Sequence, residues 1–490
     1  NNMCSIVGLE GEFNDKILIN LIKLTKNRGP DSTGLFLDDE LFLDINLNDF
    51  TTNNNHKIAL GHNLLSIFNL GELEDNYQPL TNGNLTIVFN GEIYNFKSLV
   101  NYVGKVYEKT NILTDSYLIL KLIEYFYSKN SDLLESVQET NRLLDGDYSF
   151  AVYDGENLAI ARDSLGVKPL FYGKTDKFNA FSSSKYSLKQ LNIKDIKRFK
   201  PGEILYNWKV ISNLDKIANK QIQVTGDITK QLESKLKLST LKRVLNLDEI
   251  AVIFSGGVDS AILTLLLKKI SENKNLKITL YTVGKENSKD IIASKKLAKW
   301  FKLPLKTIEI TPEIIKENLE EVVKLIGENN LMKIGVGMTI YLSCKKIHED
   351  GLKVAISGQG ADELFAGYNR YLKSFKTGKL SEELRYDIDN MYHVNLERDD
   401  AVSMANGVEL RLPFLDKNLV EFALNIPVEY KIANEEDKLR KNILRNLGSN
   451  LGLPDEFAYR PKKAAQYGTG IDKILRKKVL KEVDIDKILE

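Results

Sequence analysis

The chain has 490 residues, too many for one hydrophobic core, and at roughly 100 to 200 residues per domain we expect two or three domains. Lys and Arg number 68 against 67 Asp and Glu, so a net charge of +1 provides no field that would steer the protein toward nucleic acid or an anionic membrane. No apolar run reaches the roughly 18 to 20 residues of a membrane span. Cys4 and Cys344 are the whole cysteine inventory, which excludes a disulfide framework and argues against structural zinc. We therefore expect a cytoplasmic globular protein.

Residues 5–207 contain short apolar runs bounded by turn residues, such as LTIVFNGEIYN and YSFAVYDG, and these predict strands. Helical patterns at 15–28 and 114–128 lie between them. The first half of the chain is therefore predicted to be an α+β domain of packed sheets. A polar segment at 208–228 is the predicted linker.

From residue 229 onward, long helical patterns alternate with short apolar strands such as EIAVIFSGG and KVAISGQG. This alternation predicts a parallel sheet covered by helices. The tail from Ile471 is rich in Lys and Glu with regularly spaced apolar residues, which predicts a surface helix.

The first strand of this second half runs into the hexapeptide SGGVDS at 255–260 and then into an apolar helix. Two glycines let the backbone approach a ligand, and hydroxyls and free amides at a helix start favour phosphate oxygens. The loop lacks the lysine of a P-loop for phosphoryl transfer. An ordinary turn capped by Asp259 or Ser260 is the alternative, but the complete hexapeptide between strand and helix favours a phosphate site.

A second glycine-rich loop, SGQGADEL, places Asp362 and Glu363 at another helix start. The helix dipole alone would explain carboxylates there. However, Asp259 and Asp362 both follow strands of one predicted sheet, at the edge where such folds bind ligands. Because two hard oxygen donors facing a triphosphate suit Mg²⁺, we predict that this pair binds the metal.

SGGVDS resembles the loop of the ATP pyrophosphatases. Together with RDDAVSMANGVELRLPFLD at 398–416 and YRPKKAAQYGTG at 459–470, it makes nearly the whole chain similar to glutamine-dependent asparagine synthetases. This resemblance implies an N-terminal nucleophile (Ntn) hydrolase sandwich of αββα layers at 4–207 and an α/β parallel-sheet ATP pyrophosphatase domain at 229–490. It also implies that ATP activates L-aspartate as β-aspartyl-AMP, which ammonia from glutamine converts to L-asparagine.

The segment MCSIVG at 3–8 resembles the start of class II amidotransferases, in which the methionine is removed and the cysteine becomes the terminal nucleophile. A thiol of pKa about 8.5 beside an α-amine of about 7.7 to 8 provides nucleophile and base on one residue. This chemistry needs no histidine, and the four histidines form no pair at ligand spacing. If Asn1 and Asn2 remain attached before Met3, Cys4 has no free α-amine.

The resemblance assigns the remaining site residues. Catalysis falls to Cys4, Asn90, Gly91 and Lys462, with Asn90 and Gly91 as the oxyanion hole. Glutamine binding is assigned to Arg28, Leu64, Leu65, Ser66, Ile67, Asn90, Gly91, Glu92 and Asp115, and RGPD also supplies Asp31. ATP binding is assigned to Phe254, Ser255, Gly256, Gly257, Val258, Asp259, Ser260, Val283, Ser357 and Gly358. The intermediate site consists of Gln359, Asp362 and Lys462. Without the resemblance, a hairpin turn would explain 90–92, a helix cap Asp115, and a solvated basic run Lys462.

One position departs from the family pattern, because Leu64 stands where the resemblance expects an arginine that holds the glutamine α-carboxylate. Losing a charge-assisted hydrogen bond of roughly 1.5 to 3 kcal/mol should lower the affinity for glutamine by about ten- to a hundredfold. An ammonia-dependent synthetase with an inactive glutaminase therefore stays open. So do a β-lactam-forming type of synthetase, which lacks the cysteine, and a nucleotide-binding protein without catalysis.

The partners expected are small molecules, namely L-aspartate, L-glutamine or ammonia, and ATP. Nothing in the sequence indicates nucleic acid or membrane as a partner. Whether the chain acts alone or as a homodimer is left open.

Overall fold

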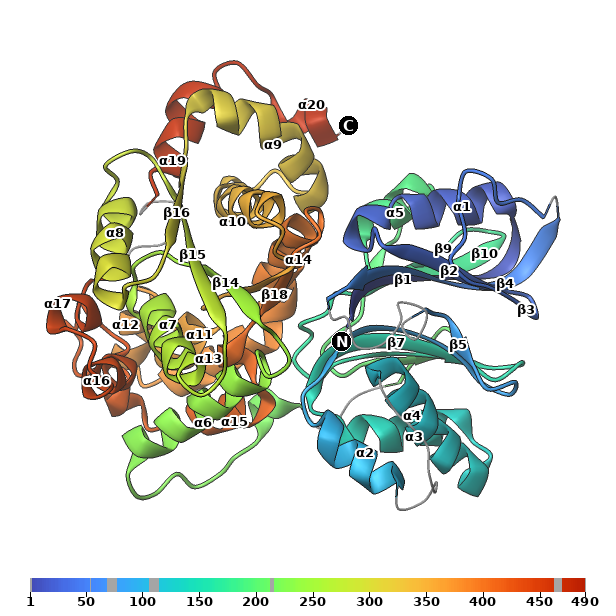
Figure 1. The fold of residues 1–490 in the computed structure, drawn as a ribbon, viewed down its shortest axis with the longest axis horizontal. Helices are drawn as coiled ribbons and strands as arrows, with labels where there is room; N and C mark the ends of the chain where they lie inside the picture. The colour runs from blue at the N-terminus through green and yellow to red at the C-terminus, as the bar shows by residue number, and fades with distance from the viewer. Residues whose placement is uncertain are drawn as a thin grey trace. The chain divides into compact units, whose positions relative to one another are not determined.

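The computed structural model describes residues 2–52, 54–67, 77–104, 114–211, 216–461 and 469–489. The chain divides into two compact units, Asn1–Lys216 and Ile217–Glu490 (Figure 1). The change of unit falls inside the segment predicted as the linker. None of the helices in the described ranges is long and apolar enough to cross a membrane.

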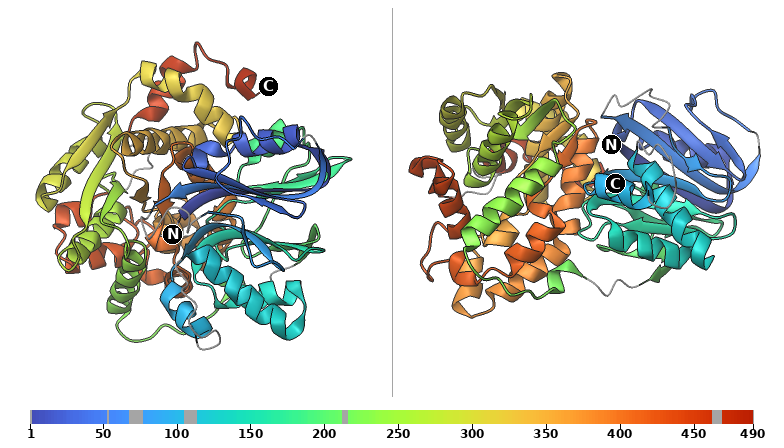
Figure 2. Two further views of the ribbon diagram at one scale, coloured as in Figure 1. Left: turned by 45° about the vertical axis from the view of Figure 1, so that its right-hand side comes forward. Right: turned by 60° about the horizontal axis from the view of Figure 1, so that its bottom comes forward.

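The first unit is built from many short strands and a few helices. In chain order its elements are β1 (Asn2–Asn14), α1 (Asp15–Lys23), η1 (Lys26–Arg28), β2 (Ser32–Leu37), β3 (Glu40–Phe42), β4 (Asn55–Ser66), β5 (Leu80–Thr81), β6 (Thr86–Ile93), α2 (Phe96–Gly104), α3 (Asp115–Asn130), α4 (Leu133–Leu143), β7 (Gly146–Tyr153), β8 (Leu158–Arg162), β9 (Phe171–Lys174), β10 (Phe178–Ser182), α5 (Lys185–Gln190), β11 (Lys197–Arg198), β12 (Ile204–Tyr206) and β13 (Lys209–Ile211). The strand pairings are antiparallel. Two β-layers lie face to face, with α1 and α5 over one and α2, α3 and α4 over the other (Figures 1 and 2).

Hydrophobic clusters fill the spaces between these four layers. Ile6 of β1 belongs to the cluster between the two β-layers, whereas its neighbour Val7 belongs to the cluster beneath α1 and α5. A third cluster joins α3 and α4 to β6 and β7. Because successive side chains of a strand point to opposite faces, one strand can serve two clusters. This αββα sandwich confirms the fold predicted for the first half.

The helix expected at 15–28 ends earlier, at Lys23. The Ile22 carbonyl accepts hydrogen bonds from the Thr25 hydroxyl at 3.1 Å and from Asn63 Nδ2 at 3.0 Å. Side-chain donors thus bond to a carbonyl that would accept a backbone hydrogen bond if the helix continued. The chain then makes only the short η1 turn before Ser32.

The second unit has a small sheet and many helices. Its elements are η3 (Ile217–Asn219), α6 (Ile228–Lys242), β14 (Glu249–Ile253), α7 (Val258–Ser271), β15 (Lys277–Gly284), α8 (Lys289–Phe301), β16 (Leu305–Glu309), α9 (Pro312–Ile326), α10 (Leu331–Glu349), β17 (Val354–Ile356), α11 (Ala361–Phe365), α12 (Tyr371–Lys376), α13 (Leu380–Met391), η4 (Tyr392–Leu396), α14 (Glu397–Met404), β18 (Glu409–Arg411), η5 (Pro413–Leu415), α15 (Lys417–Leu424), η6 (Val428–Tyr430), α16 (Asn442–Asn450), α17 (Asp455–Ala458), α19 (Ile471–Ile474), η7 (Leu475–Val479) and α20 (Ile485–Leu489). The tail from Ile471 therefore forms short helices rather than one, and it buries Ile471, Leu475 and Val479.

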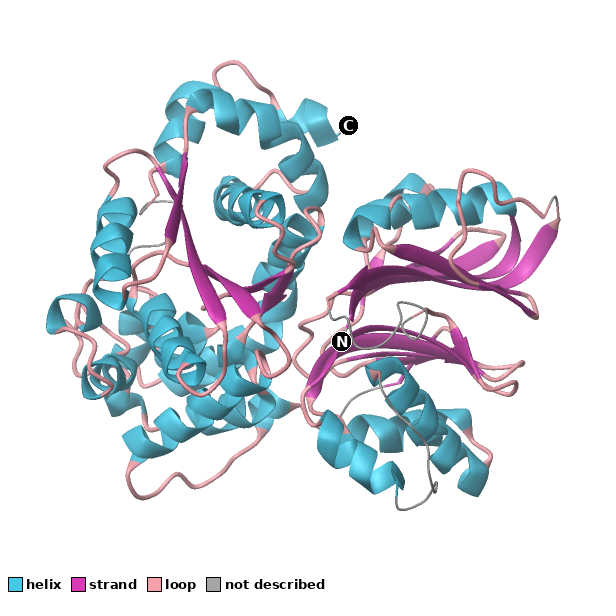
Figure 3. Cartoon of the chain, in the orientation of Figure 1, coloured by secondary structure: helices cyan, strands magenta, loops and turns pink. Residues whose placement is uncertain are grey.

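The sheet of the second unit has the order β16-β15-β14-β17-β18, and all its pairings are parallel. Helices cover both faces, with α7 and α8 on one and α10 and α14 on the other (Figures 1 and 3). This arrangement confirms the predicted α/β fold. After β14 the chain continues to β15, on one side of it in the sheet, whereas after β17 it continues to β18, on the other side. The strands β14 and β17 therefore flank the switch point where such sheets bind ligands.

Lys431, just after η6, is a buried lysine outside this sheet edge. Its side chain is 1% exposed, and its Nζ donates to the Ala423 carbonyl at 2.7 Å. Burial, with a smaller contribution from Arg385, lowers the pKa of Lys431 to about 7. An unfolded lysine titrates near 10.4. Between these two pH values the unfolded chain therefore holds a proton that the folded chain has released.

Stability should accordingly rise with pH across this window. The free energy of unfolding of the wild type, relative to that of Lys431→Met, should increase between about pH 7 and 10 by something on the order of 2 to 4 kcal/mol, because the penalty for burying the charge disappears. Urea denaturation of both proteins across this range measures the difference. If the free energies of unfolding of the two proteins changed equally with pH, the expectation would be contradicted.

Candidate active sites

Cys4 lies in β1 and is fully buried. Its backbone nitrogen donates a hydrogen bond of 3.1 Å to Asn90 Oδ1 on β6. Cys4 is also paired with Leu64 of β4 in the antiparallel register. Three residues predicted from separate segments therefore meet where three strands come together.

Strand alternation places these three side chains in the space between the β-layers. Each lies at an even spacing, on its own strand, from a member of the apolar cluster that fills this space, namely Ile6, Leu60 and Val88. Residues at even spacing on a strand point to the same face. Cross-strand partners such as Cys4 and Leu64 are also close neighbours on that face. The side chain at position 64 is therefore adjacent to the thiol.

Asn90 Nδ2 is buried and has no hydrogen-bond partner among the described residues. Directly opposite on β7, the Ser149 hydroxyl is also buried and lacks a partner within the same part of the chain. Gly91 has a φ of 152°, and a Cβ there would lie 2.2 Å from the Asp147 carbonyl oxygen, so only glycine fits. A preorganised amide donor beside a nucleophile can stabilise a developing oxyanion. Ser149 was not foreseen, because it reads as an ordinary strand residue.

The RGPD segment packs against β4. Arg28 ends η1 and is buried. Three residues later, the Asp31 nitrogen donates to the Leu64 carbonyl at 2.9 Å, and Asp31 Oδ2 accepts from the Ser66 nitrogen at 2.7 Å. These bonds hold the segment against residues 64–67, which were predicted to bind glutamine.

Asp115 occupies the first turn of α3, behind the N-cap residue Thr114. Its Oδ2 atom accepts a hydrogen bond of 3.1 Å from the Ile93 nitrogen at the end of β6. The neighbouring Glu92 is buried in the same strand. The structure thus brings both carboxylates predicted to bind glutamine to one strand end.

In the second unit, the hexapeptide forms a tight turn between β14 and α7. Gly256 has a φ of 68°, and a Cβ there would lie 2.8 Å from the Ser294 nitrogen of α8. The Ser260 hydroxyl accepts from the Ser255 nitrogen at 3.4 Å and donates to the Gly257 carbonyl at 3.3 Å. Glycine is therefore required where the loop touches α8. The turn directs backbone amides at the start of a long helix, which is a favourable place for phosphate.

The parallel pairing of β14 with β17 brings both predicted loops together. A Cβ on Gly358 would lie 3.2 Å from the Asp259 Cβ. The Lys441 Nζ atom lies 2.8 and 2.6 Å from the two Asp259 carboxylate oxygens and 2.6 Å from Asp362 Oδ1. Two carboxylates from different loops therefore share one ammonium. The other residues predicted for the nucleotide lie in the hexapeptide itself or at the carboxyl ends of β14, β15 and β17, namely Phe254, Val258, Val283 and Ser357.

This donor set suits Mg²⁺, because two carboxylates already converge on a single cation. The described residues contain no group of three His, Cys, Asp or Glu side chains that could hold a metal. Mg²⁺ is commonly held by one or two carboxylates, with water and substrate phosphates completing the coordination. Asp259 and Asp362 would therefore hold the metal only together with the phosphates of a nucleotide.

Lys441 was not predicted, because KLRKNILRN reads as a solvated basic helix. In the structure its side chain is 1% exposed, and burial lowers the pKa of Lys441 while the charge of Asp259 raises it. Arg440 and Lys441 both have left-handed backbone, with φ of 57° and 54°. Two consecutive non-glycine residues in this region indicate strain that the surrounding contacts must offset.

Arg445 provides those contacts. It is fully buried, and its guanidinium donates to carbonyls on two segments. Before Lys441 it reaches the Arg440 oxygen at 2.7 Å and the Leu439 oxygen at 2.9 Å. Farther along the chain it reaches the Ala458 and Arg460 oxygens at 2.9 and 2.8 Å. One side chain therefore positions both Lys441 and the start of the segment that leads to residue 462.

Gln359 follows β17, and its Nε2 donates to the Asp399 carboxylate of α14. Arg398 Nε donates to the same carboxylate at 2.7 Å. Burial raises the pKa of Asp399, and Arg398 opposes this shift. The Gln359 amide is thus oriented by a buried ion pair from the 398–416 segment.

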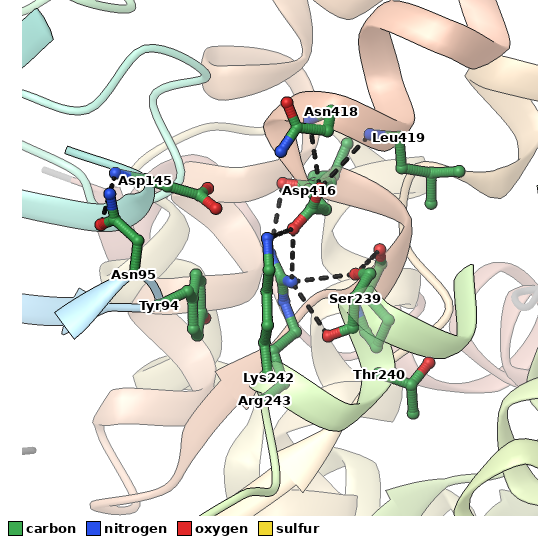
Figure 4. Close-up of polar contacts among 12 residues, drawn as sticks. Tyr94, Asn95, Asp145, Ser239, Thr240, Lys242, Arg243, Asp416, Asn418 and Leu419 are labelled. Carbon is green, nitrogen blue, oxygen red and sulfur yellow. Dashed lines mark hydrogen bonds and ion pairs between the residues drawn. The ribbon is translucent and has the colours of Figure 1, made fainter. Parts of the chain in front are cut away.

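The later part of that segment is structural. Asp416 Oδ2 lies 3.2 Å from Lys242 Nζ of α6 and 3.4 Å from Nη1 of Arg243, the C-cap residue of that helix (Figure 4). Asp416 Oδ1 accepts from the Asn418 nitrogen at 3.1 Å and so caps α15. These contacts join α6 to α15 rather than forming a ligand site.

Lys462 lies outside the described residues, so its role stays a prediction. Cys344 is fully buried in α10, and burial raises the pKa of its thiol, which makes it a poor nucleophile.

An Ntn-type sandwich with a buried cysteine on its first strand, followed by a parallel-sheet unit with a glycine-rich loop between β14 and α7, is the fold of a glutamine amidotransferase coupled to an ATP-using synthetase. The sequence model of a glutamine amidotransferase domain matches residues 3–199, and that of asparagine synthase matches residues 231–380 and 373–485. The chain therefore belongs to the asparagine synthase family, in its glutamine-hydrolysing form.

Several relatives are similar over most of the chain. A Methanocaldococcus jannaschii protein provisionally named asparagine synthetase (glutamine-hydrolyzing) 1 is 38% identical over 97% of this chain and 95% of its own length. The asparagine synthetase (glutamine-hydrolyzing) of Gallus gallus is 30% identical over 78% of this chain and 72% of its own. Asparagine synthetase B (glutamine-hydrolyzing) of Escherichia coli is 28% identical over 99% of this chain and 85% of its own.

Replacing Arg445 tests its role in positioning Lys441. Arg445→Lys keeps the charge but removes the guanidinium and most of its N–H donors. Each buried carbonyl left without a hydrogen bond should cost about 1 to 3 kcal/mol. We expect a loss of roughly 3 kcal/mol or more in the free energy of unfolding, measured in urea. Arg476→Lys is the control, because Arg476 forms a pair with Asp472 that is half-exposed and should change stability by less than about 1 kcal/mol. Equal effects in both variants would contradict this role.

Proposed function

We propose that this chain converts L-aspartate to L-asparagine, using ATP to form β-aspartyl-AMP and glutamine as the nitrogen donor. The products would be asparagine, glutamate, AMP and pyrophosphate. Membership of the asparagine synthase family supports this assignment. The observation that carries it is the convergence of Asp259 and Asp362, from two glycine-rich loops, on one cation position.

In the synthetase unit, backbone amides of 255–260 would bind ATP phosphates at the N-terminus of α7. The aspartate side-chain carboxylate attacks the α-phosphorus, and the bond to the bridging oxygen breaks to release pyrophosphate. Mg²⁺, when bound with ATP by Asp259 and Asp362, would neutralise charge on the departing phosphates. Lys441 adds a second positive charge at that edge. Gln359, Asp362 and Lys462 are the residues proposed to contact the acyl intermediate.

In the first unit, the Cys4 thiol would attack the glutamine amide after giving its proton to the Cys4 α-amine. Asn90 Nδ2 and the Gly91 nitrogen are the donors proposed for the oxyanion that forms. The intermediate collapses as the Cys4 α-ammonium returns its proton to the leaving nitrogen, which releases ammonia and leaves a thioester that water hydrolyses to glutamate. The ammonia then attacks the acyl carbon of β-aspartyl-AMP, and AMP leaves.

A second candidate function is an ammonia-dependent synthetase with an inactive glutaminase. Leu64 favours it, because an apolar side chain lies beside the thiol where a carboxylate-binding cation was expected. The two candidates differ only in the nitrogen source that supports product formation.

Replacing Cys4 with alanine separates the two activities. With aspartate, ATP and Mg²⁺, wild-type protein whose first residue is Cys4, verified by mass, should make asparagine from either glutamine or ammonium. Cys4→Ala should lose glutamine-dependent asparagine at least about a hundredfold and keep the ammonium-dependent reaction, because only the nucleophile is lost. Product from ammonium alone in the wild type would favour the second candidate. Aspartate-dependent pyrophosphate release with no asparagine from either source would overturn the proposed substrate.

Restoring the missing cation tests the importance of position 64. Leu64→Arg should lower the KM for glutamine by about ten- to a hundredfold, because a charge-assisted bond to the α-carboxylate is gained. Steady-state glutaminase assays measure the change, and Leu64→Met, which nearly conserves volume, is the matched control. An unchanged KM in a folded Leu64→Arg protein would show that the glutamine carboxylate binds elsewhere.

A further inference from the structure

Lys441 occupies an unusual position for a lysine. Its side chain is almost fully buried, whereas its two partners Asp259 and Asp362 remain 21% and 16% exposed. Its ammonium lies within 2.8 Å of three oxygens of these carboxylates. These are also the carboxylates to which the proposed function assigns the metal.

We propose that the Lys441 ammonium fills the metal position in the ligand-free protein, and that a divalent cation enters only together with the nucleotide triphosphate. This inference rests on the proposed function, because it concerns the metal and the nucleotide assigned there. Lys441 exchanges at least one carboxylate for a phosphate oxygen when the metal–nucleotide complex binds. The lysine therefore couples metal binding to nucleotide binding.

Close packing fixes the position of the Lys441 ammonium beside the two carboxylates. A Cβ on Gly367 would lie 1.8 Å from Asp362 Oδ1 and 2.2 Å from Lys441 Cε, so glycine is needed for the lysine to reach the carboxylate. The strained backbone before Lys441 is held by Arg445, and Arg440 Nε is anchored to the Gly367 carbonyl at 3.1 Å. The backbone is thus fixed, and exchange is left to the side chain.

Electrostatics makes the two cations mutually exclusive at this place. A dication between Asp259 and Asp362 would lie within a few ångströms of the ammonium, and repulsion in a partly buried site is much less screened than in water. Phosphate oxygens remove this conflict because they supply new negative charge for both cations. If Lys441 only neutralised the two carboxylates, metal binding would not depend on the nucleotide.

Direct Mn²⁺ binding, followed by electron paramagnetic resonance of the free ion, tests this coupling without turnover. Without nucleotide, the wild type should bind Mn²⁺ weakly, and Lys441→Met should bind it at least about tenfold tighter because the carboxylate pair is uncovered. Lys441→Met/Asp362→Asn should lose that gain. Lys431→Met is the matched control, since it removes an equally buried lysine elsewhere in the same unit and should leave Mn²⁺ binding unchanged.

A second measurement uses the wild type alone, in case Lys441→Met does not fold. Anomalous diffraction from crystals with Mn²⁺ should show no ion at Asp259 and Asp362 without nucleotide. With α,β-methylene-ATP it should show one, with Lys441 Nζ displaced from at least one carboxylate. An ion there without nucleotide, an undisplaced ammonium, or equal Mn²⁺ affinity of wild type and Lys441→Met would overturn the inference. Asparagine formation by the wild type would then still stand, so this failure is distinct from failure of the proposed function.

Discussion

The interaction on which the synthetase unit depends is the sharing of one ammonium by Asp259 and Asp362. Parallel pairing of β14 with β17 brings these two carboxylates to adjacent strand ends, where like charges would repel each other. Lys441 offsets this repulsion, because its ammonium contacts both carboxylates. This shared contact is the basis for the proposed exchange between the lysine and a metal ion.

Buried cations organise the surroundings of this site. Arg445 satisfies four carbonyls, two just before Lys441 and two on the segment at 458–460, and Arg243 joins the end of α6 to Asp416 beside α15. Each guanidinium has lost its water, so its hydrogen bonds to the protein are costly to remove. These two buried arginines therefore hold segments of the second unit in place.

The glutaminase unit relies on a different constraint, the alternation of side chains along antiparallel strands. Cys4, Leu64 and Asn90 face the same space because each keeps an even spacing from the apolar cluster between the β-layers. Gly91 supports this geometry, since the backbone there approaches β7 too closely for any side chain. An apolar residue beside the thiol is therefore a feature of the site itself.

The sequence alone determined the two-part organisation, the α+β class of the first half, the parallel sheet of the second, and the loops at 255–260 and Asp362. These depend on short-range periodicity, turn chemistry and helix starts, which a sequence displays directly. The αββα layering and the role of Cys4 came from the resemblance to a known family. Only the tertiary structure revealed Lys441, Arg445, Ser149 and the Gln359–Asp399 contact. Their chemistry comes from burial and from partners distant in the chain, and a lysine within KLRKNILRN has the same local pattern whether it is solvated or closed over two carboxylates.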